Sequence, residues 1–369
     1  MGLRPSVRIA MATLVAASLG SASAGAGDRR SLIEFGWDEP DTRFLREHLA
    51  EMEKTPFDGC VYHVDAHPAG AAPASLTWQG WGRRRFSAEE VAEARADLIA
   101  VAGSPSRFRR NFLRFNTTPA DLDWFDDYSA VIANARLAAE LARSGGGPGL
   151  LLDTEAYEGK LFDYRKQRET SKRPWTEYAA QARRRGREVM AAMQDGYPGL
   201  TVFLTFGYTL PWKQSEQGRK PMSECPDGLL VPFLDGMVSA ARGSTRMVDG
   251  HELSYGYRDR SAFVEARRAI TRDAAALADD PAAHARVISA GFGLWLDHDW
   301  RKNGWHVDDP SKNDFTPAGF ERSLRSALEL SDEYVWIYTE TPRWWSVRGG
   351  PVALPPAYPE AIRRARSGD

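Results

Sequence analysis

The stretch Gly149-Leu150-Leu151-Leu152-Asp153-Thr154-Glu155 indicates how this chain folds. An uninterrupted apolar run is typical of a strand buried on both faces of a parallel sheet, and this one stops at two carboxylates. A second apolar run, 334–339, stops at Glu340 in the same way. Two buried strands that end in acids predict a parallel sheet with a polar site at its carboxyl edge.

Short apolar runs alternate with helical patterns along the rest of the chain. We expect strands at 31–37, 59–65, 110–116, 149–155, 200–207, 245–250, 287–296 and 334–340. Helical spacing is found between them at 41–54, 87–101, 128–144, 175–194, 230–242, 261–277 and 317–330. Ser87 and Thr316, the latter followed by proline, are expected to cap helix starts.

Strands that alternate with connections of this length pair in parallel through right-handed crossovers. Eight such units predict closure into a (β/α)8 barrel, the TIM barrel, as a single domain with long βα loops. The alternative is an open doubly wound sheet, which usually has a glycine-rich phosphate loop after its first strand. The segment Phe35-Gly36-Trp37-Asp38-Glu39-Pro40 stands in that place without such a loop, which favours the barrel.

The N-terminus has the pattern of a secretory signal peptide. Arginines at positions 4 and 8 precede an apolar stretch, 9–19, and small residues end at Ala24. The apolar stretch is shorter than the roughly 20 residues that span a bilayer. We therefore expect cleavage of residues 1–24 and a secreted or periplasmic barrel domain over 25–369.

The composition of the chain limits the kinds of partner and cofactor that we expect. The chain has 48 basic and 50 acidic residues and a formal charge of -2, so no broad attraction to nucleic acid or to an anionic membrane is expected after signal cleavage. Two cysteines, Cys60 and Cys225, exclude a disulfide framework but leave a single bridge open. Because neither zinc-ligand spacing nor a Walker loop is present, we expect no metal and no cofactor.

In a barrel the carboxyl ends of all strands converge, so acids that are far apart in sequence become neighbours. Hydrolysis of a glycosidic bond needs two carboxyl groups, one protonated and one ionised. The candidates for catalytic carboxyl groups are Asp153, Glu155, Glu252 and Glu340.

Asp153 and Glu155 share one face of their strand because side chains alternate with period two. Like charges at short distance raise the pKa of one partner, which supplies an acid and a base at one pH. Alternatively, one of the two acids caps the next helix or pairs with an arginine such as Arg114.

Aromatic and polar side chains near the strand ends are candidates for binding substrate. Indole rings stack on the C–H face of a pyranose, and polar groups hold its hydroxyls. For Glu340 and Trp344 the alternative is a salt bridge to Arg343 and a place in the core. The candidates for substrate binding are Trp37, Asp38, Arg114, Asn116, Trp212, Asp249, Trp295, Asp297 and Trp344.

Gly36-Trp37-Asp38 and the segment 338–345, Tyr-Thr-Glu-Thr-Pro-Arg-Trp-Trp, carry a resemblance to a known group. With these motifs the chain resembles bacterial exported TIM-barrel proteins of the glycoside hydrolase type over most of 30–350. Asp153-Thr154-Glu155 is also similar to the end of the family 18 chitinase motif, although Pro148 and Leu151 replace its earlier aspartates. The resemblance implies an exported glycoside hydrolase that cleaves a polysaccharide or oligosaccharide. The alternative is a barrel that binds carbohydrate without turnover.

Overall fold

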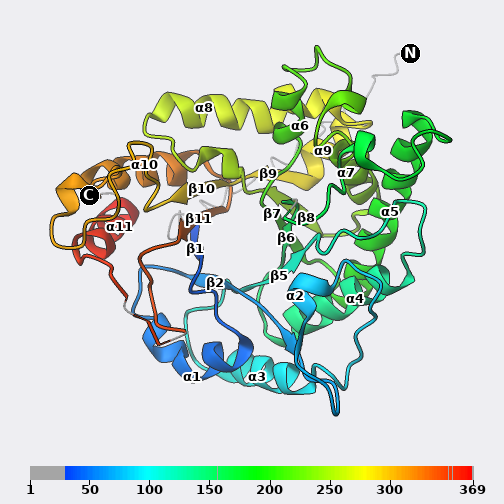
Figure 1. Ribbon diagram of the computed structural model, residues 1–369. Helices are drawn as coiled ribbons and strands as arrows, with labels where there is room; N and C mark the ends of the chain where they lie inside the picture. Colours follow the sequence, from blue (N-terminus) through cyan, green and yellow to red (C-terminus); the bar gives the residue numbers. More distant parts are fainter. Residues whose placement is uncertain (1–29, 156, 348, 351, 368–369) are drawn as a thin grey trace, which may run out of the picture.

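The computed structural model describes residues 30–155, 157–347, 349–350 and 352–367, so the predicted signal peptide lies outside it. Within the described residues, nine parallel strands form one sheet in the order β10-β11-β1-β2-β5-β6-β7-β8-β9 (Figure 1). These strands are β1 (Ser31–Gly36), β2 (Gly59–Tyr62), β5 (Phe112–Asn116), β6 (Gly149–Asp153), β7 (Thr201–Leu204), β8 (Arg246–Asp249), β9 (Ile288–Ala290), β10 (Phe292–Trp295) and β11 (Tyr334–Thr339). A short antiparallel hairpin, β3 (Asp65–Ala66) and β4 (Ala74–Ser75), follows β2.

The sheet closes through a strand that is split at Gly291. On one side of this glycine β9 pairs with β8, and on the other side β10 pairs with β11. A Cβ at Gly291 would lie 2.9 Å from Cγ1 of Val248 and 3.1 Å from the carbonyl oxygen of Tyr334, so a larger residue would push the neighbouring strands apart. Because β9 and β10 together form the seventh predicted strand, the predicted TIM-barrel fold is confirmed.

Helices surround the barrel as a ring (Figure 1). The longer ones are α1 (Thr42–Met52), α3 (Ala92–Gly103), α4 (Ser129–Ser144), α5 (Trp175–Gly196), α7 (Leu230–Ala240), α8 (Arg260–Arg268), α10 (Pro317–Leu330) and α11 (Ala357–Ser367). The shorter ones are α2 (Leu76–Gln79), α6 (Thr209–Gln214) and α9 (Pro281–Val287). Every predicted helical segment contains a helix, and 261–277 continues from α8 as a π turn and a 3-10 turn.

Two predicted helix caps have different outcomes. Thr316 accepts a hydrogen bond from the backbone N–H of Gly319, and Pro317 is the first residue of α10, as predicted. Ser87 and Glu90 form a reciprocal capping box, with bonds of 3.3 and 2.7 Å. Nevertheless, a turn follows and α3 starts only at Ala92, so the prediction of a helix start at Ser87 was wrong.

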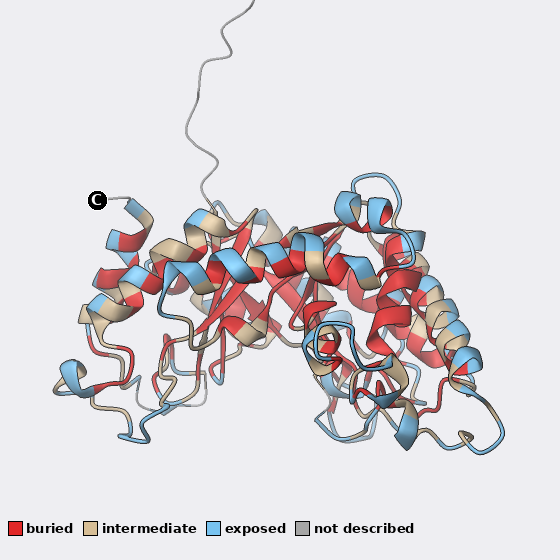
Figure 2. Ribbon diagram, turned by 90° about the horizontal axis from the view of Figure 1, so that it is seen from above, coloured by how far each residue is buried: buried red, intermediate tan, exposed pale blue. Residues whose placement is uncertain are grey.

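The barrel has an inner and an outer apolar layer. The inner layer fills the barrel and consists of Ile33, Phe35, Val61, Phe112, Leu151, Phe203, Val248, Tyr334 and Trp336. The outer layer lies between strands and helices, where Figure 2 shows buried strands behind helices with exposed outer faces. Because side chains alternate along a strand, Arg114 and Asp153 point inward with Phe112 and Leu151, whereas Glu34 and Asp249 point outward.

Cys60 and Cys225 are both buried and free, so the bridge that the sequence left open does not form. None of the helices in the described ranges is both long enough and apolar enough to span a membrane.

Candidate functional site

Arg114 occupies the centre of the barrel's carboxyl end, at the level where the inner apolar layer stops. Its Nη1 donates to Oε2 of Glu39 at 3.0 Å, and its Nη2 donates to Oδ2 of Asp153 at 2.6 Å. Only 8% of the side chain is exposed. Burial alone would lower the pKa of Arg114, but the charges of Glu39 and Asp153 raise it. We call Glu39, Arg114 and Asp153 the inner cluster.

Asp153 is saturated with hydrogen bonds. Its Oδ2 also accepts from the hydroxyl of Tyr157 at 3.0 Å, and its Oδ1 accepts from Thr205 Oγ1 and from the backbone N–H of Glu155, both at 3.1 Å. The side chain is fully buried. Of the alternatives that the sequence left open, the structure therefore shows the ion pair with Arg114, and Asp153 holds other groups in place.

We define the mouth as the space beyond the inner cluster at the carboxyl end of the barrel. Two titratable acids, Glu155 and Glu252, belong to it. Glu155 follows β6, and Glu252 begins the 3-10 turn Glu252–Ser254 after β8. Burial raises the pKa of Glu252 well above its usual range, and the charges of Asp153 and Glu155 raise it further. Burial also raises the pKa of Glu155, with a smaller contribution from Asp153. The pKa values of both carboxyl groups are thus raised, that of Glu252 more strongly.

Aromatic residues form the wall of the mouth at β10 and β11. The hydroxyl of Tyr338 donates to Oε1 of Glu340 at 3.1 Å and accepts from Nε1 of Trp37 at 2.9 Å. Tyr255 stacks on Tyr338 with ring centroids 5.4 Å apart, and Trp295 contacts both rings edge-on. Burial raises the pKa of Glu340. The structure therefore places Glu340, Trp37 and Trp295 together at the wall of the mouth.

A pocket of about 460 Å³ opens beside the inner cluster. Among the described residues, three of its aromatic side chains are largely exposed: Trp37 (63%), Trp78 (38%) and Tyr157 (45%). Exposed aromatic rings gathered in one pocket indicate a binding surface. The lining residues are Phe35, Gly36, Trp37, Glu39, His63, Asp65, Ser75, Trp78, Arg114, Tyr157 and Tyr338.

His63 links this pocket to the inner cluster. Its Nδ1 lies 3.5 Å from Oε1 of Glu39, and its Nε2 lies 3.8 Å from Oδ2 of Asp65. Burial alone would lower the pKa of His63, but the hydrogen bond and charge of Glu39 raise it above the usual value.

Asp38 and Trp344, predicted to bind substrate, are buried away from the mouth. Oδ2 of Asp38 accepts the backbone N–H of Trp344 at 2.6 Å, and only 1% of Asp38 is exposed. Trp344 packs edge-on against Phe57 with ring centroids 4.6 Å apart. Trp344 belongs to the outer layer and Asp38 is buried against its backbone. Neither is open to a ligand, and the predicted stacking role of Trp344 is corrected to a core role.

Asp249 and Asp297 hold backbone segments in place. Asp249 points outward and accepts from the backbone N–H of His251 at 3.0 Å, and burial raises its pKa to about 6. Asp297 accepts from the backbone N–H groups of Glu340 and Thr341 at 3.0 and 2.8 Å. The structure thus places Asp297 beside the mouth as a support for Glu340, and it places Asp249 outside the mouth.

Trp212 and Asn116 complete the predicted set. Trp212 is half-buried in α6, where it packs against the outer layer. Asn116 ends β5 on its inward face and is fully buried, and its side-chain amide has no hydrogen-bond partner among the residues that the structure describes.

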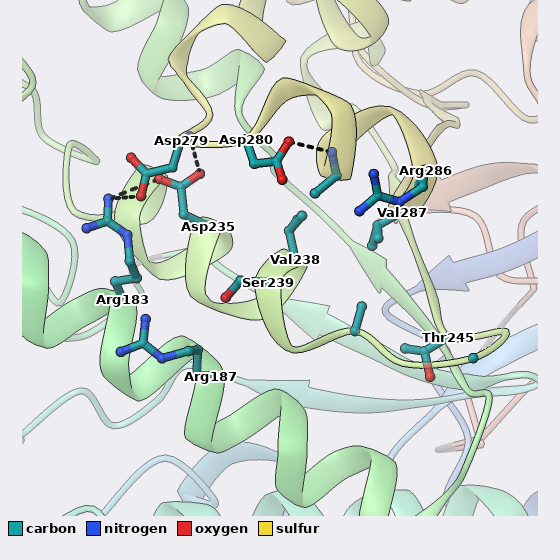
Figure 3. A pocket seen from close by; sticks show the side chains of 13 residues that line it. Arg183, Arg187, Asp235, Val238, Ser239, Thr245, Asp279, Asp280, Arg286 and Val287 are labelled. Atoms are coloured by element: carbon teal, nitrogen blue, oxygen red, sulfur yellow. Dashed lines mark hydrogen bonds and ion pairs between the residues drawn. The ribbon is translucent and has the colours of Figure 1, made fainter.

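A separate cavity of about 650 Å³ lies between α5, α7 and α9, on the outside of the helical ring (Figure 3). Arg183 pairs there with Asp235 and Asp279, at 3.4 and 2.5 Å. This cavity contains none of the residues predicted from the strand ends, so it is distinct from the candidate site. In the described ranges, no group of three or more His, Cys, Asp or Glu side chains is arranged to hold a metal ion; the absence of a metal remains a prediction.

Glu39 and Tyr157 were not predicted as site residues, although both line the pocket. Trp78 was expected only as one of several tryptophans in the long βα loops. Glu39 directly follows Asp38, and Tyr157 lies two positions beyond Glu155. Glu39 has the parity of the inward-facing Ile33 and Phe35, and Asp38 has the parity of the outward-facing Glu34. The alternation of β1, extended past its last residue, would therefore have selected Glu39.

No family model matches this chain, and no curated protein sequence matches it. Among solved structures, the chain is similar to a provisionally assigned sugar phosphate isomerase/epimerase from Anabaena variabilis, with 12% identity and a TM-score of 0.45. The match covers 92% of this chain and 97% of that protein.

The prediction that the chain is a glycoside hydrolase is corrected by two findings. The matched structure is assigned as an isomerase/epimerase and not as a glycosidase. In addition, Asp153, one of the predicted catalytic acids, is neutralised by Arg114.

Proposed function

We propose that this chain is an acid–base enzyme that moves a proton on an uncharged sugar or related polyol, as isomerases and epimerases do. The observation that carries the proposal is the pair of mouth carboxyl groups, Glu155 and Glu252, whose pKa values are both raised, that of Glu252 most strongly. Two acids that lose their protons at different pH can act as the base and the acid of one reaction.

The roles follow from the two environments. Ionised Glu155 takes a proton from the carbon next to the substrate's carbonyl group, and protonated Glu252 gives a proton to the carbonyl oxygen, which yields an enediol. Return of the proton from Glu155 to the neighbouring carbon and of a hydroxyl proton to Glu252 completes an aldose–ketose isomerisation, with no net gain or loss of electrons. A raised pKa makes Glu155 a stronger base near neutral pH.

The pocket beside the inner cluster supports a polyol as substrate. Trp37, Trp78 and Tyr157 provide apolar faces for C–H groups. The side chains of His63, Asp65 and Ser75, which also line this pocket, supply polar groups for hydroxyls. The charge of Arg114 is already balanced by Glu39 and Asp153, which favours an uncharged ligand over a phosphorylated one. Export to the periplasm or medium is part of this proposal.

Solvent isotope exchange tests the reaction. The mature protein, 25–369, is incubated with a panel of aldoses and ketoses in D₂O, and carbon-bound deuterium is followed by NMR. We expect exchange with at least one sugar and a loss of about 100-fold or more in Glu155→Gln and in Glu252→Gln. Glu158→Gln, a change at a nearby exposed residue, serves as the matched control and should retain the wild-type rate.

A second candidate is a barrel that binds carbohydrate without turnover, which the exposed Trp37 and Trp78 favour. Saturable sugar binding by wild type without deuterium exchange would support this candidate and rule out the enzyme.

A further inference from the structure

Two further carboxyl groups lie on the opposite, outward side of β1. Glu34 is fully buried, and only 1% of Asp38 is exposed. Their side chains lie within hydrogen-bonding reach of each other. Gly36 between them leaves room, since a Cβ there would lie 3.1 Å from Oδ1 of Asp38. We call Glu34 and Asp38 the outer pair.

No cation in the described part of the chain forms an ion pair with the outer pair. Both carboxyl oxygens of Glu34 and Oδ1 of Asp38 are buried without a hydrogen-bond partner among the described residues. Two ionised carboxylates buried in contact would repel each other and lose their hydration. A single proton between them removes one charge and supplies the missing donor.

The outer pair also anchors the segment that starts at Glu340. Oδ2 of Asp38 accepts from the backbone N–H groups of Trp344 and Trp345 at 2.6 and 3.4 Å. The backbone oxygen of Asp38 accepts from Nε1 of Trp345 at 2.7 Å. Arg343, in the same segment, lies over the ring of Trp37 with Cζ 5.8 Å from the ring centre. This segment therefore connects the outer pair to the wall of the mouth.

We propose that Glu34 and Asp38 share one proton and that this proton positions the segment 340–347 against β1. The titratable and charged groups facing the pair are Glu39, Arg343 and the Cys60 thiol. Burial raises the pKa of Glu34 well above its usual range, and the negative charges of Asp38 and Glu39 raise it further, whereas Arg343 lowers it slightly. Burial raises the pKa of Asp38 as well. The proposed proton lies between two buried carboxyl groups that no described cation neutralises. Its loss at alkaline pH leaves two like charges in contact, and their repulsion displaces Asp38 together with the segment that it anchors.

Infrared difference spectroscopy tests the shared proton without reference to any substrate. At neutral pH the wild-type spectrum contains the carbonyl stretch of a protonated carboxylic acid, and subtraction of the Glu34→Gln spectrum leaves this band. Asp38→Asn is the second variant. It leaves buried Glu34 with its own proton, so the Glu34 band should persist there but shift, because its hydrogen-bond partner changes. The band of Glu252 is common to all three proteins and cancels in the difference spectra. A spectrum of wild type minus Glu34→Gln that lacks the band overturns the proposal.

The positioning role is tested by the indole N–H signal of Trp345 in ¹⁵N NMR spectra recorded from neutral to alkaline pH. We expect the wild-type signal to broaden or shift as the proton leaves, and the signal of Glu34→Gln to stay unchanged over the same range. Glu252→Gln removes a different buried proton and should behave as wild type. An alkaline transition that persists in Glu34→Gln contradicts the proposal but leaves the proposed reaction untouched.

Discussion

The inner cluster and the outer pair are two groups of buried carboxylates, one inside the barrel and one outside it. Glu39 and Asp153 lie inside and share Arg114, at 3.0 and 2.6 Å. Glu34 and Asp38 lie outside, without an ion pair to any described cation. The pKa of Glu39 is lowered despite burial because Arg114 and His63 stabilise its charge, whereas the pKa of Glu34 is strongly raised.

The comparison shows that burial raises the pKa of an acid unless a neighbouring cation compensates, as Arg114 does for Glu39. A carboxylate paired with arginine keeps its charge and fixes the geometry around it. Burial raises the pKa of a carboxylate without such a partner, as it does for Glu252 in the mouth and for Glu34 behind β1. Only the second kind can donate a proton or respond to alkaline pH.

The largest expected effect comes from removing the cation of the inner cluster. Arg114→Met leaves Glu39 and Asp153 buried without their partner, and breaking a buried ion pair in this way costs about 3–5 kcal/mol. Urea unfolding at neutral pH measures the change in the free energy of unfolding. The deficit should shrink as the pH falls, because protons then neutralise the stranded carboxylates.

Arg43→Met is the matched control, since Arg43 pairs with Glu47 at 3.1 Å on the exposed face of α1. Surface pairs of this kind contribute little, so its free energy of unfolding should hardly change. Equal losses in both variants would show that the inner cluster is not stabilised by its buried charges.

Most of the fold could be predicted because it depends on the spacing of apolar residues. Each predicted strand is present, since a strand buried on both faces needs a continuous apolar run. The break at Gly291 could not be foreseen, because it depends on how closely β8 and β11 approach when the barrel closes.

The site was harder to predict because it depends on contacts between strands. A strand such as 246–249 is buried on both sides, so its apolar run does not tell which residues point inward, and Asp249 was assigned to the mouth although it points outward. Asp153 and Glu155 were placed correctly near the strand end, but the arginine that neutralises Asp153 comes from the neighbouring β5. Which acid keeps its proton depends on such contacts between strands.

A change of intermediate size is expected when the outer pair loses its shared proton. In wild type the folded state holds a proton that the unfolded chain releases near pH 4.3, the usual glutamate value. Stability therefore falls by about 1.4 kcal/mol per pH unit from there up to the raised pKa of the pair. Glu34→Gln removes this dependence, so the variant gains stability relative to wild type as the pH rises.

Urea unfolding at several pH values measures this slope. Glu47→Gln is a control of opposite sign, because the hydrogen bond from Arg43 lowers the pKa of Glu47, and the wild-type carboxylate is then stabilising above its usual pKa. A pH profile of Glu34→Gln that runs parallel to wild type would mean that the outer pair is not protonated, and the contrast with the inner cluster would disappear.

The smallest expected effect is a change in the pKa of His63, at the exposed edge of the inner cluster. Glu39 contacts both Arg114 and His63, so its negative charge stabilises the protonated imidazole. In Glu39→Gln the pKa of His63 should fall, because burial, which lowers it, is no longer opposed by this carboxylate. Titration of the His63 ring signals by NMR measures the shift. Asp65→Asn is the matched control, with a smaller decrease expected because Asp65 lies farther from the ring and is more exposed. If Asp65→Asn lowered the pKa of His63 as much as Glu39→Gln does, Glu39 would not stabilise the protonated imidazole more than Asp65 does. The inner cluster would then not include an interaction with His63 in the pocket.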